Sequence, residues 1–142
     1  MIKVAVTLPA ELGDPGEFLA DVRALEAAGA EMVGLETDGQ EQRILMGAIA
    51  AVTSRIKLRL ASPEGAPTLQ RLSRGRTVVG LPAGETWATI DMPPDRESWA
   101  AVMREQEAAG VTGVVVAWDP RLIDLIRNPE PDDRSDLLMS TG

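Results

Sequence analysis

Residues 14–38 read DPGEFLADVRALEAAGAEMVGLETD, and residues 95–119 read DRESWAAVMREQEAAGVTGVVVAWD. The second segment starts 81 residues after the first and aligns with it over 25 positions without a gap. Both begin and end with aspartate and carry Glu-Ala-Ala-Gly at the same place. Each also follows a short apolar run that proline closes. The chain therefore repeats one supersecondary unit, and this repeat decides the fold class.

Each copy of the repeat predicts a helix followed by a strand. Asp14 can cap a helix that Pro15 opens, and Glu17 completes a capping box. Apolar residues at helical spacing follow, and Gly29 is suited to the left-handed residue that ends a helix. Residues 32–35 then read as a buried strand, and Asp95 starts the same pattern in the second copy. Phe18 and Trp99 occupy the helix stripes, and we expect both in the core.

Strands and helices alternate along the rest of the chain as well. The expected strands are residues 2–8, 32–35, 55–60, 76–81, 87–91 and 111–118, and the expected helices are 14–28, 40–53, 68–73, 95–109 and 119–127. This alternation predicts an α/β fold with a parallel sheet of five or six strands and crossover helices. Its simplest form is a truncated TIM-barrel-like domain over residues 1–129, followed by an acidic tail over residues 130–142.

Composition excludes several classes of function. The 142 residues include 14 Lys and Arg against 22 Asp and Glu, a net charge of −8 that repels nucleic-acid backbones. Cysteine and histidine are absent, which removes disulfides, thiol nucleophiles, the usual zinc sites and imidazole bases. No apolar run approaches the roughly 20 residues of a membrane span. The first residues show no secretory signal, so we expect a cytoplasmic protein with no nucleic-acid or membrane partner.

Any ligand site should lie beyond the carboxyl ends of the strands, as in other parallel α/β proteins. Four carboxylates stand at these ends: Glu36, Asp38, Asp91 and Asp119. They could bind a divalent cation or act as acid and base, although Asp38 and Asp119 also read as helix caps. The sequence assigns no catalytic residue and no metal site.

Two further groups of side chains have two interpretations each. Trp118 ends a buried strand, where its ring could form the wall of an aromatic ligand site or pack in the core. Arg71, Arg74 and Arg76 could bind phosphate or carboxylate, or could flank a solvated turn. The sequence alone does not decide between these alternatives.

Five segments resemble the bacterial luciferase-like family of flavin-dependent oxidoreductases. They are residues 4–9 (VAVTLP), 18–35 with its LEAAGA turn, 47–58 (GAIAAVTSRIKL), 72–81 (LSRGRTVVGL) and 110–129. The resemblance implies a β/α barrel and an FMN or F420 cofactor that carries out the redox chemistry. The residues expected to contact that cofactor, at the ends of their strands, are Glu36, Thr37, Ser62 and Trp118.

The chain departs from that family in length and in its site. A complete eight-stranded barrel takes roughly 250 residues, so this chain cannot close one. The loops of later strands that hold the flavin phosphate are largely missing, and no glycine-rich phosphate loop replaces them. An unfinished barrel exposes two sheet edges and an apolar inner face, and we therefore expect a homodimer.

Two functions stay open. One is a flavin- or F420-dependent oxidoreductase or monooxygenase that acts as an oligomer. The other is a non-catalytic protein derived from that family, which binds a small molecule or serves as an oligomerisation or accessory module.

Overall fold

The computed structural model describes residues 1–9, 11 and 13–129, and the expected acidic tail lies outside these residues. The described chain is an α/β structure with a six-stranded parallel sheet, as the sequence predicts. In chain order, the elements are β1 (Lys3–Leu8), α1 (Pro15–Ala28), β2 (Met32–Leu35), α2 (Gly39–Val52), β3 (Lys57–Leu60), α3 (Ala66–Leu72), β4 (Thr77–Val79), β5 (Trp87–Thr89), α4 (Arg96–Ala108), β6 (Gly113–Ala117) and α5 (Leu122–Arg127).

The strand order is β4-β3-β2-β1-β6-β5, and every neighbouring pair is parallel. The first four strands advance in one direction across the sheet. The chain then returns to the opposite edge, where β5 and β6 advance toward β1. This is the order expected of a barrel wall from which consecutive strands are missing, with β4 and β5 as the two open edges.

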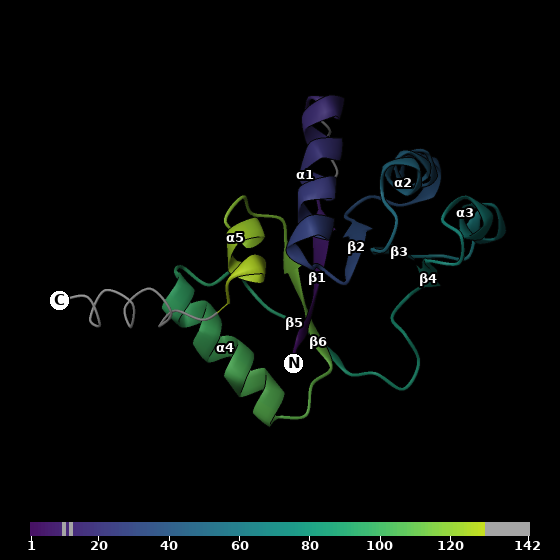
Figure 1. Cartoon of the computed structure of the whole chain (residues 1–142). Helices are drawn as coiled ribbons and strands as arrows, with labels where there is room; N and C mark the ends of the chain where they lie inside the picture. The colour runs from purple at the N-terminus through teal and green to yellow at the C-terminus, as the bar shows by residue number, and fades with distance from the viewer. Residues whose placement is uncertain (10, 12, 130–142) are drawn as a thin grey trace.

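All five helices of the described chain cover the same face of the sheet (Figure 1). One core cluster joins side chains from every helix to alternate residues of the strands. On β1 these strand residues are Val4, Val6 and Leu8, all buried. A doubly wound sheet would carry helices on both faces, so the one-sided arrangement is that of a barrel wall.

The two copies of the repeat have the predicted local structure. The Asp14 carboxylate accepts hydrogen bonds from the N–H groups of Gly16 (2.8 Å) and Glu17 (3.1 Å) at the start of α1. The Asp95 carboxylate accepts one from Ser98 N–H (2.8 Å) at the start of α4. At the other end of α1, Gly29 has φ 107°, a conformation that favours glycine.

The face of the sheet without helices, here called the inner face, has a small core of its own. Ala5, Met32 and Val115 are buried there, with Val78 and Trp87 packed against them. A Cβ atom on Gly113 would lie 2.7 Å from the Trp87 ring carbon Cη2 and 2.8 Å from the Lys3 carbonyl oxygen. Glycine at position 113 therefore makes room for the indole ring over β6.

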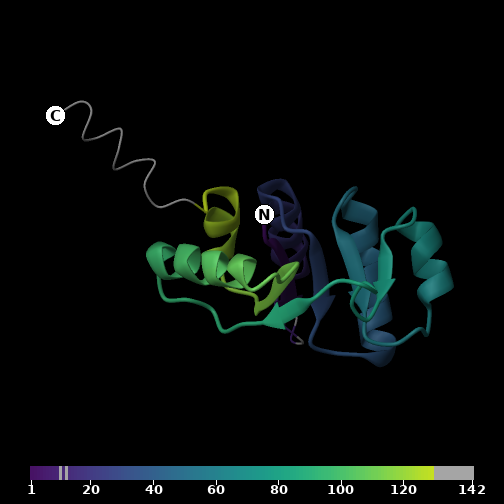
Figure 2. The same ribbon diagram turned by 90° about the horizontal axis from the view of Figure 1, so that it is seen from below.

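The connection of residues 80–86 runs between the two edge strands on this side of the sheet (Figure 2). It delivers Trp87 to the inner face, where the ring covers the apolar centre. The prediction of an exposed apolar inner face is therefore wrong for this centre. The reason is that the short edge strand β5 carries a tryptophan large enough to cover it.

Candidate functional site

Three of the four expected cofactor-binding residues follow two neighbouring strands. Glu36 comes directly after β2, is exposed, and donates its backbone N–H to the Leu8 carbonyl (3.0 Å). The Thr37 carbonyl accepts a hydrogen bond from Nε2 of the buried Gln42 (3.0 Å). Ser62 follows β3 and is half-buried. The structure thus places these three residues at the same end of the sheet.

Trp118, the fourth expected residue, lies on the other side of the sheet. It continues the alternation of Val114 and Val116, and its side chain packs against the core under the helices. It lines a small pocket of about 170 Å³ together with Phe18. Glu36, Thr37 and Ser62 do not line this pocket. The structure therefore does not bring Trp118 together with the other three residues.

The pocket beside Trp118 is strongly acidic. Its lining includes Glu11, Asp14, Glu17 and Asp21. Four carboxylates around so small a space repel a phosphate-bearing ligand. Trp118 and Phe18 are both partly buried and pack against the core while they line this pocket.

The four carboxylates at the strand ends do not form a metal site. Among the described residues, no group of three acidic side chains could hold a metal ion. Asp119 instead accepts hydrogen bonds from the backbone N–H (2.9 Å) and the guanidinium (3.0 Å) of Arg121. These bonds from Arg121 lower the pKa of Asp119 below its ordinary value. Asp38 stands at the N-cap of α2, but its side chain makes no capping hydrogen bond.

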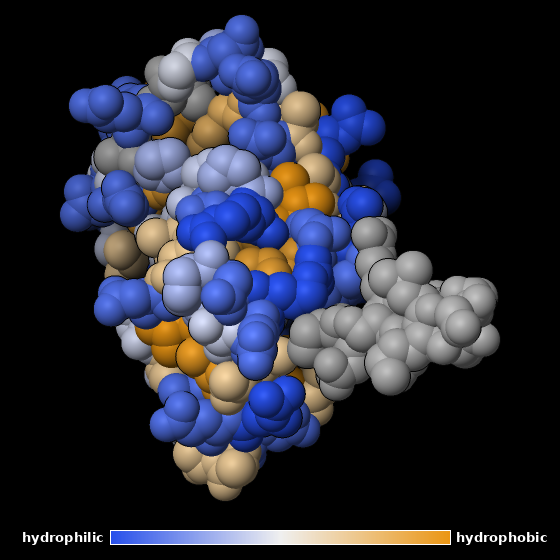
Figure 3. Space-filling view, turned by 90° about the vertical axis from the view of Figure 1, so that its left-hand side faces the viewer, coloured by the Kyte–Doolittle hydropathy of each residue, from blue (hydrophilic) through white to orange (hydrophobic). Residues whose placement is uncertain are grey.

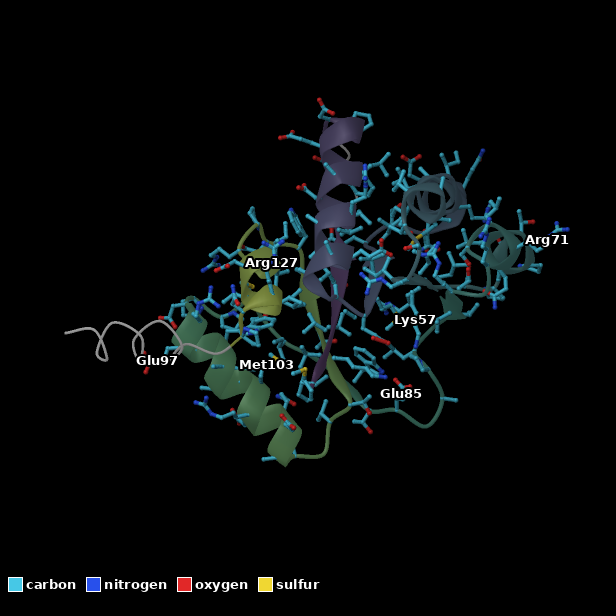
Figure 4. The ribbon with its side chains drawn as sticks, viewed as in Figure 1. Lys57, Arg71, Glu85, Glu97, Met103 and Arg127 are labelled. Atoms are coloured by element: carbon cyan, nitrogen blue, oxygen red, sulfur yellow. The ribbon has the colours of Figure 1, made fainter. Side chains whose placement is uncertain are left out.

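Arg76 is a structural residue, which neither interpretation of the basic cluster anticipates. Its guanidinium donates hydrogen bonds to five oxygens: Ser73 O (2.7 Å), Thr53 Oγ1 (2.8 Å), Ile56 O (2.8 Å), Thr53 O (3.0 Å) and Ala50 O (3.2 Å). The carbonyls of Ala50 and Thr53 belong to the end of α2, where no basic residue stands in the last turn. Arg76 thus satisfies carbonyls that this helix end leaves open. Arg71 and Arg74 are exposed, and Arg71 points outward from α3 (Figure 4).

Another arginine, which sequence analysis did not single out, lies on the inner face. Arg59 of β3 lies across Gly34 of β2: a Cβ atom on Gly34 would stand 3.0 Å from both Nε and Nη2 of the arginine. Arg59 Nε is buried and has no hydrogen-bond partner, which is true of no other buried side-chain nitrogen or oxygen among the described residues. Basic and apolar residues alternate in residues 57–60, and this pattern indicates that Lys57 and Arg59 lie on the face without helices.

Lysines accompany Arg59 on the inner face. Nζ of Lys57 lies 3.3 Å from Oε1 of Glu31, and Nζ of Lys3 lies 4.0 Å from the same oxygen. Lys57 and Glu85 lie on the side of the sheet where the 80–86 connection runs (Figure 4). Glu85 is engaged as well, since its Oε1 accepts a hydrogen bond from Trp87 Nε1 (3.0 Å). The Glu31 carboxylate thus lies beside two lysines.

A groove of about 520 Å³ lies at the other end of the sheet, near the start of β1. Its lining includes the apolar residues Ile2, Trp99, Met103 and Ile126, and charged residues such as Glu107. Met103 points from α4 toward the sheet (Figure 4). Figure 3 views the side of the molecule that α4 and α5 form, where small apolar areas show between charged ones. The sequence predicts ligand sites only at the carboxyl ends of the strands, and not at this groove.

No family model and no curated protein matches this chain. Within the described residues, no helix has the length and apolar character needed to cross a membrane.

Proposed function

We propose that this chain is a relative of the luciferase-like flavin- or F420-dependent oxidoreductases and acts as an oligomer. The observation that carries the proposal is the order β4-β3-β2-β1-β6-β5 with all helices on one face. A barrel of the luciferase-like type would give this order if strands between the fourth and the last two were lost. The resemblance in sequence falls on β1 to β4 and on β6 with α5, which are parts of that wall.

The proposed cofactor site is the carboxyl-end half of the inner face. Its floor is low, because the row of residues across β6, β1 and β2 consists of Ala117, Thr7 and Gly34. Glu36, Thr37 and Ser62 stand at the rim of this floor. Arg59 supplies a guanidinium whose buried Nε has no partner among the described residues, which fits a ligand that carries a phosphate.

In this proposal a bound flavin or F420 supplies the redox chemistry, and the chain supplies binding and orientation. The sequence has no histidine, cysteine or tyrosine. Proton transfer would therefore fall to carboxylates such as Glu36 and Asp91 at the rim, or to water held by Thr7.

Binding of the cofactor is tested by titrating the purified protein with FMN and with F420. Trp87 lies on the inner face, so we expect its fluorescence to fall as the cofactor binds. Trp87→Phe keeps an aromatic ring in place and identifies that signal, and Trp118→Phe, on the other face, is the matched control. Absence of binding at high micromolar concentrations of both cofactors would contradict the proposal.

The oligomer is proposed from the open edges of the sheet. At the β4 edge, three large apolar residues are exposed: Leu72 (58%), Val79 (44%) and Leu81 (42%). An apolar edge strand with unpaired backbone groups is a site for pairing with another chain. Light scattering coupled to size exclusion should give about twice the chain mass of 15.1 kDa. A monomer of 15.1 kDa would contradict a dimer.

The second candidate is a non-catalytic oligomerisation or ligand-binding module. It is favoured by Trp87, which occupies the centre of the inner face, and by Trp118, which packs under the helices instead of facing a ligand. A dimer that binds neither FMN nor F420 would support this candidate over the first.

A further inference from the structure

Arg59 occupies an unusual position for a charged side chain. It projects from β3 onto the inner face and lies across the neighbouring strand, over Gly34. The flanking residues of β3, Leu58 and Leu60, face the helix-side core, so the alternation fixes Arg59 on the opposite face. Glycine at position 34 leaves space for the arginine in this position, because a Cβ atom there would lie 3.0 Å from both Nε and Nη2.

Within the part of the chain that the structure describes, the buried Nε of Arg59 has no hydrogen-bond acceptor. A buried donor without a partner destabilises the folded state, and more so when the group is charged. Arg76, by contrast, has five oxygen acceptors. The two arginines show that this chain can satisfy a guanidinium fully when its role is structural, and that it does not do so for Arg59.

On one side of Arg59, the inner face carries only small residues. In the row that contains Arg59, the strands β2, β1 and β6 contribute Gly34, Thr7 and Ala117, all of which are small. Ala117 is exposed, and Thr7 and Arg59 are half-buried, so solvent reaches this row. Thr7 adds a hydroxyl group two strands away from the arginine.

Charges further along the inner face limit which ligands fit. Toward the amino ends of the strands, Lys57 and Lys3 share the Glu31 carboxylate, and the Glu85 carboxylate is bonded to Trp87. Toward the carboxyl ends, Glu36 and Asp91 follow β2 and β5 and are exposed. A ligand that is anionic throughout would be repelled at the Glu36 and Asp91 end, whereas a ligand with one anionic group would not.

We propose that Arg59 is the anion-recognition residue of a binding site on the inner face, and that the site takes a small molecule with a single phosphate or carboxylate group. The anionic group lies over the row of Thr7, Gly34 and Ala117, and Arg59 turns from Gly34 to bind it. The neutral remainder of the ligand extends toward the rim. The proposal does not require a flavin, because any small molecule with one such group meets the same chemistry.

The experiment follows the Nε–H resonances of the arginines and the backbone amides by NMR during titration with inorganic phosphate or acetate. Ionic strength is held constant with chloride, so that general screening is the same throughout. We expect saturable shifts of Arg59 Nε–H and of the Gly34 and Thr7 amides, whereas Arg76 Nε–H does not move. Comparison of the phosphate and acetate series shows which of the two groups the site prefers.

Two variants separate a site from general electrostatics. Arg59→Gln should weaken phosphate or acetate binding at least about tenfold, which corresponds to 1.4 kcal/mol. Arg71→Gln removes the same charge from the outer surface of α3 and should leave binding unchanged. Shifts that do not saturate, or equal binding by both variants, would overturn the proposal. If Arg59→Gln does not fold, the shifts of the unmodified protein decide, since they must centre on Arg59, Gly34 and Thr7.

Parallel titrations with FMN and riboflavin keep this proposal separate from the proposed cofactor. Tighter binding of FMN than of riboflavin, lost in Arg59→Gln, supports both proposals. Saturable phosphate or acetate binding without flavin binding supports the anion site and removes the flavin. Equal binding of FMN and riboflavin, with no saturable shift by phosphate or acetate, overturns the anion site and leaves the flavin in place.

Discussion

The units β1-α1-β2 and β5-α4-β6 share a sequence pattern but not an environment. The helix α1 lies in the middle of the helix row, and α4 lies at its end (Figure 1). In α1 the buried residues are Val22 and Leu25, in the second half of the helix. In α4 they are Trp99 and Ala100, near its start. The repeat therefore determines how each helix is capped and that the strands of each unit run parallel. The place of the unit in the sheet determines which part of its helix is buried.

This difference explains the groove of about 520 Å³. The positions of α4 that correspond to Val22 and Leu25 are Met103 and Gln106, and both are only half-buried. The second half of α4 therefore does not pack tightly, and Met103 lines the groove that it leaves.

The largest expected effect is at the Leu25 position of the repeat. Leu25→Ala should lower the free energy of unfolding by about 2–5 kcal/mol, because it leaves a cavity in a fully buried site. The matched change Gln106→Ala should cost less than about 0.5 kcal/mol. Urea denaturation measures both, and equal losses would show that the two units are buried alike.

The next effect concerns a glutamate near the C-terminal end of α1 and its counterpart in α4. Glu26 Oε2 accepts hydrogen bonds from the backbone N–H groups of Ser54 (2.8 Å), Arg55 (2.6 Å) and Ile56 (2.9 Å). Its counterpart Glu107 forms an exposed ion pair with the Met1 ammonium (3.5 Å). Glu26→Ala should cost about 1–2 kcal/mol, because two of the three amides can turn to water and one is partly buried. Glu107→Ala should have almost no effect in urea denaturation, and a loss equal to that of Glu26→Ala would contradict this distinction.

A smaller effect is expected where the two units are most alike. Asp14→Ala should cost about 0.5–2 kcal/mol through loss of the cap on α1. Asp95→Ala should destabilise the protein in the same direction, because its carboxylate also caps a helix. Asn at either position should restore most of the loss in thermal denaturation, since its side-chain oxygen can accept the same bond. Failure of Asn to do so would argue against a capping role.

The smallest effect is a dependence on pH that belongs to the first unit. Partial burial acts to raise the pKa of Glu26, but three backbone N–H donors outweigh it and hold the pKa below its ordinary value. A carboxyl whose pKa is lower in the folded state stabilises the protein above its unfolded pKa of about 4.5. This stabilisation is lost as the pH falls through the folded pKa.

The difference in unfolding free energy between the unmodified protein and Glu26→Ala should therefore shrink as the pH is lowered below the ordinary glutamate pKa of about 4.5, in urea denaturation at each pH. A difference that stays constant over this range would contradict the role of the Glu26 charge.

Much of the fold could be predicted from the sequence because the signals were local. The two ends of α1 are marked by local capping residues, namely Asp14 with Pro15 at the start and Gly29 at the end. Because the repeat carries the same pattern, it predicted α4 as well. The α/β class and the parallel sheet followed from alternation. The return of the chain from β4 to the far edge did not follow from any local signal, because it depends on β6 pairing with β1.

The site was predicted less well because its residues act across strands. The sequence favours Trp118 as part of a ligand site because the residue ends a buried strand. The face of the sheet on which its side chain lies is set by Val114 and Val116, which point into the core under the helices. Trp87 read as part of a short strand, and its cover over Ala5, Met32 and Val115 needs the register of β5 against β6. The role of Arg76 was hidden for the same reason, since its acceptors are 3 to 26 residues away in the chain.

The central place of β1 in the sheet has a consequence for how the chain folds. The strand β1 pairs on one side with β2, which follows it closely in the chain, and on the other side with β6, which comes more than a hundred residues later. During synthesis, one edge of β1 must wait until nearly all of the described chain has left the ribosome. Because this pairing joins residues so far apart in the chain, we expect the protein to fold more slowly than one of the same size whose strands pair only with their neighbours in sequence.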